Sequence, residues 1–305
     1  MDFRRLAGLT ICHLTCMSSR VTVACRKCSS PEVNMHKLTD QTPIQLGRVD
    51  SVDHVVSALR THGLALVTGI TGRTDTLALG QALGTVRTHR DSDSYGVTAI
   101  AQRSNVAGQV GMGGFSDRDL SPHTDGSALQ QPPKLLIMTC IHRAADGGDT
   151  VLIDGHEIYR EIAHTDPGML DALCAPRSVH FGAGAGFLGS IFQPQPDGRV
   201  TVRFRLDDLV RLSPTVSPYL DRLRPLLARQ ARRRRLDAGE GFVTLNDRWL
   251  HGRTRFRGDR LLLRILGDPL PQHAIPAGFP VDPTEAVADL AAAAPRPVES
   301  GSMTT

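Results

Sequence analysis

Three side chains of the kind that bind transition metals fall in two short motifs that lie far apart in the chain. The first motif, Ser121-Pro-His-Thr-Asp-Gly-Ser127, contains His123 and Asp125, and the second, Asn246-Asp-Arg-Trp-Leu-His-Gly-Arg-Thr254, contains His251. Two imidazoles and one carboxylate hold a ferrous ion on one face and leave its other positions open for a cosubstrate and O₂. A fold that uses these residues together must bring the second motif back to the first.

The spacing of His123 and Asp125 also has a structural meaning. On a β-strand, side chains two positions apart point to the same face, so both groups can face one metal while Thr124 points away. An H-x-D triplet alone is not specific in a chain of 305 residues with 12 histidines. The alternative is a solvated pair at His123 and Asp125, with His251 a hydrogen-bonded core histidine.

Two arginines downstream of the second motif predict anion binding. The run from Arg260 to Leu266 is short, apolar and aliphatic, which indicates a buried strand with Arg260 and Arg264 on one face. Buried arginines need anionic partners, and a guanidinium binds a carboxylate through two parallel hydrogen bonds. A dicarboxylate cosubstrate and an anionic substrate meet that need. An internal ion pair with Asp259, Asp268 or another acid is the alternative.

A glycine pair between two apolar runs predicts a tight turn. The segment Gly147-Gly-Asp-Thr150 precedes Val151-Leu-Ile-Asp154, so Thr150 is expected to open a strand. The Thr150 hydroxyl can donate to a carboxylate, and a plain hairpin is the alternative. The apolar run Lys134–Cys140 is expected to pair with residues 150–153 across this turn.

Together these motifs resemble the Fe(II)/2-oxoglutarate dioxygenases of the TauD/TfdA superfamily, including its clavaminate synthase-like branch. The motifs occur in the family's order, and the resemblance covers roughly residues 45–275. It implies that His123, Asp125 and His251 bind Fe(2+), with 2-oxoglutarate and O₂ as cosubstrates. Halogenating relatives have a small residue in place of the carboxylate, so Asp125 favours oxygenation.

The resemblance also implies roles for the anion-binding residues. Thr150 and Arg260 would hold the distal carboxylate of 2-oxoglutarate. Arg264 is similar to the second arginine, which in several members meets the acidic group of the substrate. The gap from His251 to Arg260 is shorter than usual in the amino-acid-hydroxylating branch, so the roles of the two arginines can be exchanged.

The fold implied by the resemblance is α+β, with a double-stranded β-helix (jelly roll) core flanked by helices. The implied enzyme hydroxylates, or otherwise oxidises, an unactivated C–H bond of a small, anionic or amino-acid-like substrate in specialised metabolism. Desaturation, epoxidation or cyclisation by the same oxidant remains open. Two classes compete with this interpretation: a non-catalytic metal-binding jelly roll that acts as a sensor, and a regulatory nucleic-acid binder that uses the cysteine-containing N-terminus and the arginine run.

Composition and length predict one folded domain with two tails. A chain of 305 residues can bury one substantial core. We expect a disordered, cysteine-containing extension at 1–34, a dioxygenase domain at 35–284 and a flexible Ala/Pro-rich tail at 285–305. The pair Cys25 and Cys28 has zinc-ligand spacing, and a signal peptide is a further alternative for the extension. Isolated thiols at Cys140 and Cys174 and a ferrous site favour a cytoplasmic protein.

Hydropathy and charge limit the kinds of partner that the chain is expected to bind. No apolar stretch is long enough for a membrane span, and the net charge of +4 is mild. The run Arg232–Arg235 is expected to close a helix, where its cations suit the helix dipole, rather than to bind nucleic acid. Arg203 and Arg205 are expected on one solvated strand face, with a substrate contact as the alternative. A small molecule is therefore the expected partner, and the oligomeric state is open.

Hydrophobic periodicity and turn residues predict the secondary structure. Predicted helices span 51–61, 77–83, 156–163, 167–174 and 218–235, and predicted strands span 64–67, 96–100, 134–140, 150–153, 200–206, 241–245 and 260–266.

Overall fold

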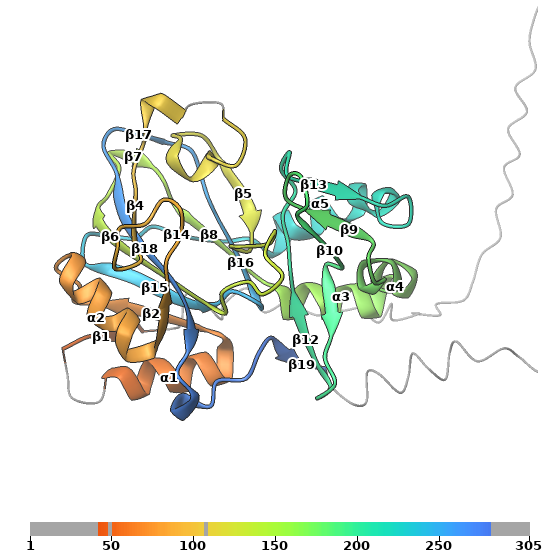
Figure 1. Ribbon diagram of the computed structural model, residues 1–305, viewed down its shortest axis with the longest axis horizontal. Helices are drawn as coiled ribbons and strands as arrows, with labels where there is room; N and C mark the ends of the chain where they lie inside the picture. The colour runs from red at the N-terminus through yellow and green to blue at the C-terminus, as the bar shows by residue number, and fades with distance from the viewer. Residues whose placement is uncertain (1–41, 48–50, 107–108, 282–305) are drawn as a thin grey trace, which may run out of the picture. The chain divides into compact units, whose positions relative to one another are not determined.

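The largest element of the structure is a seven-stranded sheet (Figure 1). The computed structural model describes residues 42–47, 51–106 and 109–281, all within one compact unit, Leu38–Thr305. The strands lie in the order β1, β2, β15, β6, β18 and β3, and β4 also pairs with β18. They span Ile44–Gln45 (β1), Leu64–Thr68 (β2), Gly84–Arg87 (β3), Val97–Ile100 (β4), Leu135–His142 (β6), Glu240–Leu245 (β15) and Leu261–Pro269 (β18).

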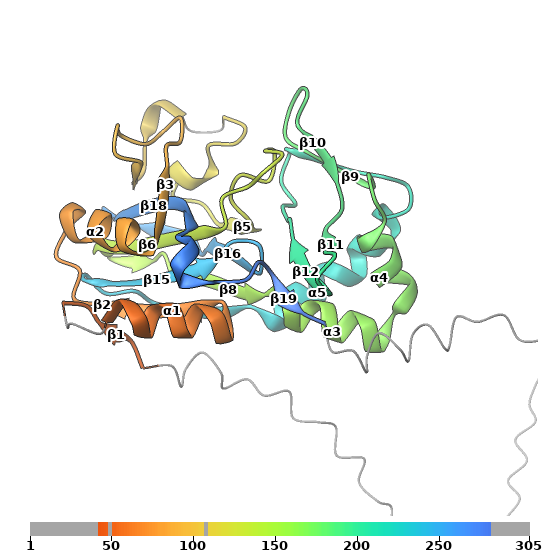
Figure 2. The ribbon, with the colours of Figure 1, turned by 60° about the horizontal axis from the view of Figure 1, so that its bottom comes forward.

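The central strands of this sheet are covered on both faces, which explains their nearly continuous apolar sequences. β6 is buried from Leu135 to Cys140. Helices α1 (Ser51–His62) and α2 (Arg73–Leu83) pack apolar stripes into one cluster with strand residues such as Val243 and Ile265. Figure 2 shows α1 running alongside the sheet. The helices predicted at 51–61 and 77–83 are confirmed, and so are the strands predicted at 64–67, 96–100, 134–140 and 241–245.

A second, four-stranded sheet carries both candidate metal motifs. It is antiparallel, in the order β14 (Arg232–Arg234), β8 (Thr150–Asp154), β16 (Trp249–Arg253) and β5 (Leu120–His123). Leu152 and Trp249 of this sheet belong to the same core cluster as Leu66, Leu136 and Phe242 of the large sheet. The two sheets therefore bury apolar side chains against each other.

The predicted pairing of residues 134–140 with 150–153 is wrong. β6 pairs with β15 and β18, whereas β8 pairs with β14 and β16, so the two strands lie in different sheets. Gly147 and Gly148 have φ values of 66° and 75°, which only glycine adopts readily. The chain uses these two positions to leave one sheet and enter the other. A local turn motif alone does not distinguish such a crossover from a hairpin.

A helical and stranded region separates β8 from β15 and has its own hydrophobic core. Asp154 begins it, because its carboxylate caps α3 at the amide of His156 and accepts two hydrogen bonds from Arg248, 3.0 and 2.8 Å long. The helices predicted at 156–163 and 167–174 are confirmed. The elements are α3 (Gly155–Thr165), α4 (Pro167–Cys174), β9 (Val179–Phe181), β10 (Phe187–Gly189), β11 (Phe192–Pro194), β12 (Arg199–Val202), β13 (Val210–Leu212) and α5 (Leu220–Gln230), with β19 (Phe279–Pro280) added to β12.

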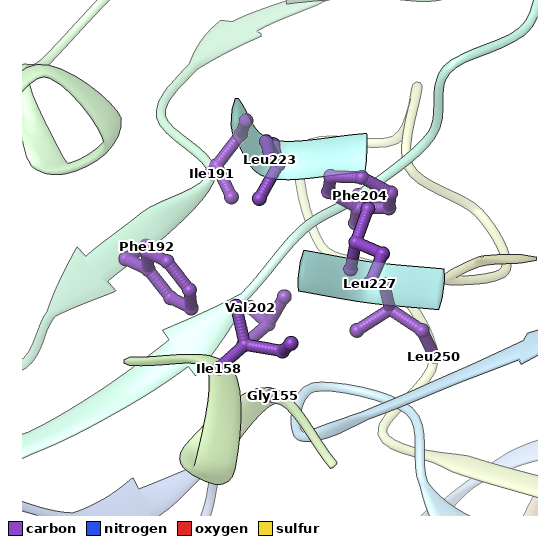
Figure 3. Close-up of a pocket in the computed structure, with 9 residues that line it drawn as sticks. All are labelled: Gly155, Ile158, Ile191, Phe192, Val202, Phe204, Leu223, Leu227 and Leu250. Carbon is purple, nitrogen blue, oxygen red and sulfur yellow. The ribbon is translucent and has the colours of Figure 1, made fainter. Parts of the chain in front are cut away.

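A small apolar cavity lies inside this region (Figure 3). Its lining consists of one glycine and eight hydrophobic side chains and contains no titratable or metal-ligating group. The lining residues are Gly155, Ile158, Ile191, Phe192, Val202, Phe204, Leu223, Leu227 and Leu250. We therefore interpret this cavity as part of the packed core and not as a polar substrate site.

Two predictions in this region are wrong. The helix predicted at 218–235 ends at Gln230, and the arginines that follow form β14, an edge strand opposite residues 150–152. Charged residues on an edge strand oppose pairing with another chain, which explains them without a helix dipole. The strand predicted at 200–206 ends at Val202, and Arg203 beyond it is buried rather than solvated.

The predicted terminal segments, 1–34 and 285–305, lie outside the described residues. Within the described part of the chain, no helix has the length and hydropathy needed to cross a membrane.

The first testable prediction concerns Asp247, in the connection between β15 and β16. Its Oδ1 is buried without a hydrogen-bond partner among the described residues, and burial raises the pKa of Asp247 to about 6. The unfolded chain loses this proton at lower pH, so the group destabilises the fold as pH rises from about 4 to about 6. We expect Asp247→Asn to stabilise the protein by about 1–3 kcal/mol at pH 8 and to have little effect at pH 4.

Urea unfolding at the two pH values measures the difference. The exposed Asp171→Asn serves as the control. An equal effect of Asp247→Asn at both pH values would contradict the assignment.

Candidate metal centre

The antiparallel pairing of β16 with β5 brings the two metal motifs together. His251 lies directly opposite His123 in the register of the two strands, and their ring centroids are 4.3 Å apart. Asp125 follows β5 by two residues, in a turn rather than on the strand. One ligand atom from each of the three residues falls within 4.8 Å of the other two. These three side chains can therefore hold a single metal ion.

The imidazole of His123 is held in an orientation suited to a ligand. Its Nδ1 is 2.9 Å from the carbonyl oxygen of Ser121, so Nδ1–H is the donor in that contact. Its other ring nitrogen, Nε2, faces Asp125 at 3.7 Å from Oδ1. A backbone acceptor on one ring nitrogen fixes the tautomer that presents the other nitrogen to a metal.

Asp125 is kept ionised in a buried position. Burial opposes the charge, but the Arg264 guanidinium and the two neighbouring imidazoles, those of His123 and His251, outweigh it and hold the pKa of Asp125 well below its usual range. Its backbone is fixed by Asn246, whose Oδ1 accepts from the amide of Asp125 at 2.8 Å and whose Nδ2 donates to its carbonyl at 2.9 Å. The carboxylate is thus ionised, and its backbone is held in place, before a cation binds.

His251 is a neutral imidazole inside the protein. Burial, followed by the interaction with the neighbouring His123 ring, lowers the pKa of His251 to about 3. Its Nε2 lies 3.8 Å from Oδ2 of Asp125, and its buried Nδ1 has no hydrogen-bond partner among the described residues. A neutral ring next to an ionised carboxylate matches the protonation states that metal binding requires. The donor set of two histidine nitrogens and one carboxylate suits iron.

Arg264, on β18, reaches the same centre from the large sheet. Its Nη1 lies 3.1 Å from Oδ2 of Asp125, and its Nη2 lies 3.4 Å from Nδ1 of His89. Burial and the Arg264 charge lower the pKa of His89, so this ring accepts from the guanidinium. The buried Nε of Arg264 has no partner in the described part of the chain. Arg264 therefore retains a donor for an anion close to the metal position.

Arg260 lies just before β18, and no carboxylate in the described residues pairs with it. Its hydrogen bond there is a long one, 3.5 Å from Nη2 to the carbonyl of Gly148. The side chain is buried, and burial lowers the pKa of Arg260 to about 10, so the guanidinium stays protonated at neutral pH. Thr150, two residues after Gly148, is also buried, at the start of β8. Among the described residues, no hydrogen bond or ion pair joins Thr150 or Arg260 to His123, Asp125 or His251.

The sequence did not predict the structural roles of three residues at this centre. Asn246 grips the backbone of Asp125, and Arg253 and Arg203 bind the backbone on either side of the first motif. Asn246 and Arg253 lie within the second motif, so their proximity to His251 in the sequence was a signal that they lie near the site. Arg203 gave none, because its partners lie more than seventy residues away, at Ser127 and Leu129.

Comparison with known proteins agrees with this geometry. A uridine-5'-phosphate dioxygenase from Streptomyces sp is 29% identical over 203 residues, which cover 60% of this chain and 73% of that protein. The structure of an asparagine oxygenase with Fe(II), 2S,3S-3-hydroxyasparagine and succinate matches with a TM-score of 0.58 at 14% identity, over 82% of this chain and 94% of that one. The non-heme iron oxygenase OrfP with Fe, succinate and (3S)-hydroxy-L-Arg matches with a TM-score of 0.58 at 16% identity, over 77% and 87%.

The fold is that of these non-haem iron oxygenases, and the three convergent side chains form a group that can hold a metal ion. The model of the taurine catabolism dioxygenase TauD, TfdA family matches residues 32–266. The chain therefore belongs to the TauD/TfdA dioxygenase family, which confirms the predicted family and enzyme class.

The second testable prediction concerns Asn246. Asn246→Ala removes the partners of the Asp125 amide and of the carbonyls of Asp125 and Pro133, all of them buried. We expect a loss of about 2–4 kcal/mol of unfolding free energy, because buried polar groups left without partners are costly.

Urea unfolding measures this loss, and the exposed Asn105→Ala provides the control. A change as small as that of Asn105→Ala would contradict a role for Asn246 in holding Asp125.

Proposed function

We propose that His123, Asp125 and His251 are the iron ligands of a 2-oxoglutarate-dependent oxygenase. The single observation that carries this proposal is the convergence of their ligand atoms within 4.8 Å. Iron and 2-oxoglutarate, when bound, would activate O₂, so that one oxygen atom enters a C–H bond of the substrate and the other enters the succinate formed with CO₂. The chain's own residues supply placement and exclusion of water. Asp125 and the neutral His251 need no proton removed before they bind the metal.

We propose further that Arg260 and Thr150 bind the distal carboxylate of 2-oxoglutarate. Arg260 is a buried cation without a carboxylate partner among the described residues, a state that an incoming carboxylate relieves. Gly148 permits this arrangement, because a Cβ at that position would lie 3.1 Å from Nε of Arg260. The Thr150 hydroxyl supplies a second donor from β8, the strand that begins two residues after Gly148.

We assign the acidic group of the substrate to Arg264. This arginine already contacts Asp125, so an anion bound to it lies beside the metal position. A small carboxylate or amino acid fits the guanidinium fork, and a phosphate monoester fits it as well. The names of the similar proteins support both chemistries, because one acts on uridine-5'-phosphate and two bind hydroxylated amino acids.

We also propose that the two packed sheets form the walls of a double-stranded β-helix and that the oxygenase domain spans 35–284. The shared cluster of Leu152 and Trp249 with Leu66 and Phe242 supports two facing walls. The match of the family model to residues 32–266 supports the extent of the domain.

The third testable prediction concerns the ligands. Fe(II) followed by 2-oxoglutarate, added anaerobically to metal-free protein, is expected to give the weak visible charge-transfer band of a chelated 2-oxo acid. His123→Ala and His251→Ala should each abolish the band, because two ligands hold iron poorly. The exposed His142→Ala, at the end of β6, is the matched control and should leave the band intact. Iron affinity equal to that of the wild type in both ligand variants would refute the assignment.

The fourth testable prediction separates the two arginines. Arg260→Ala should raise the 2-oxoglutarate concentration at half-maximal band intensity by about 10–100-fold, since it removes a buried charged donor. Arg264→Ala should shift that concentration much less and should weaken substrate binding instead. The readout is the band itself, titrated with 2-oxoglutarate at saturating Fe(II). A larger shift in Arg264→Ala than in Arg260→Ala would mean that the two roles are exchanged.

A further inference from the structure

The segment before the first metal motif is fixed by a buried arginine of the second motif. Arg253, two residues after His251, donates from Nη1 to the carbonyl of Gly114 at 3.2 Å and from Nη2 to the carbonyls of Ser116 and Arg118 at 2.7 and 2.6 Å. Only 4% of Arg253 is exposed, and no carboxylate in the described residues pairs with it. Its partners are backbone oxygens of the irregular segment that leads into β5.

The segment after the motif is fixed in the same manner by a second buried arginine. Arg203 donates from Nη1 to the carbonyl of Ser127 at 2.6 Å and to that of Leu129, and from Nη2 to that of Gln130 at 3.3 Å. Its guanidinium carbon lies 3.8 Å from the ring centre of Phe187 on β10. Arg203 likewise has no carboxylate partner among the described residues.

Both arginines are attached to elements that carry or support metal ligands. Arg253 lies on β16 with His251, so it ties the strand of the distal ligand to the segment before His123. Arg203 precedes Phe204, whose carbonyl accepts from the amide of Thr124 at 2.8 Å, between the two proximal ligands. A planar guanidinium with five donors reaches several carbonyls at once, whereas an ammonium group is a point donor.

The geometry points to Arg203 and Arg253 as positioning residues. We propose that they hold the backbone on both sides of His123 and Asp125, so that the three ligands already converge before the metal binds. This inference rests on the proposed ligand assignment. It predicts that losing either arginine weakens metal binding even though all three ligands remain, because ligands that are not held in place must be ordered when the metal binds.

The first experiment compares Arg203→Met and Arg253→Met with a matched control, Arg199→Met. Arg199 also donates to backbone carbonyls, those of Ala277 and Gly278 at 2.6 and 2.9 Å, but it makes no hydrogen bond to the segments on either side of His123 and Asp125. Fe(II) is titrated anaerobically into each full-length protein, with the fluorescence of Trp249 as the signal. Trp249 is the single tryptophan of the chain and lies two residues before His251 on β16.

We expect the Fe(II) dissociation constant to rise about 10–100-fold in Arg203→Met and Arg253→Met and less than about 3-fold in Arg199→Met. Wild-type affinity in both folded variants would overturn the inference. An equal weakening in Arg199→Met would also overturn it, because the effect would then follow from general loss of stability. If the wild type itself does not bind Fe(II), the ligand assignment fails together with the inference.

The second experiment measures amide hydrogen exchange in the metal-free proteins. The amides of Thr124 and Asp125 donate to the Phe204 carbonyl and to Asn246 Oδ1, so their exchange rates report the order of the motif. We expect both amides to exchange at least about tenfold faster in each Met variant, and Fe(II) to restore part of the protection. Arg203→Lys and Arg253→Lys, which keep the charge, should give intermediate rates and serve if the Met variants do not fold. Unchanged exchange in the Lys and Met variants would overturn the proposal.

Discussion

The pairing of β16 between β8 and β5 is the constraint on which the rest of the structure depends. This register sets His251 opposite His123 and also sets Arg253 opposite Thr150. A slip by one residue would turn every side chain of β16 to the other face and separate the two histidines. The packing of Trp249 into the core between the sheets holds the same register through apolar contacts. The metal position is therefore a consequence of backbone pairing and core packing together.

The centre handles charge in an unusual way for a protein interior. Asp125 is a buried anion with Arg264 beside it, whereas Arg203, Arg253 and Arg260 are buried cations whose partners are backbone carbonyls. Carbonyl dipoles satisfy the hydrogen bonds of a guanidinium but leave its charge uncompensated. The buried part of the protein that holds these side chains thus carries an excess of positive charge, which suits the binding of an anionic cosubstrate. Arg203 and Arg253 each donate three hydrogen bonds to the backbone, whereas Arg260 donates one long one among the described residues.

Elements that depend on local sequence were predictable, whereas features that depend on partners remote in the sequence were not. The helices at 51–61 and 156–163 were predictable, because their apolar periodicity and end residues lie within the segments themselves. The crossover at Gly147 and Gly148 was not, since positive φ values serve a hairpin and a sheet-to-sheet connection equally well. The arginine run at 232–234 was wrongly assigned to a helix end. Its pairing with β8, a strand about eighty residues earlier in the chain, makes it an edge strand, and the local sequence does not contain that partner. Arg203 is buried because it donates to the carbonyls of Ser127 and Leu129, which are remote in the sequence, and no local pattern predicts these partners.

The sequence by itself determined the chemistry that this protein can perform. The types and order of His123, Asp125, His251, Arg260 and Arg264 indicated a family, a metal and a cosubstrate, because side-chain chemistry and local spacing are properties of short segments. Only the tertiary structure decided which of these groups meet: it placed Arg264 on Asp125, left Arg260 apart from the metal position, and assigned Asn246 to the backbone of Asp125. The physical reason is that hydrogen bonds and charge interactions act over a few ångströms, and strand pairing rather than sequence distance sets which groups come that close.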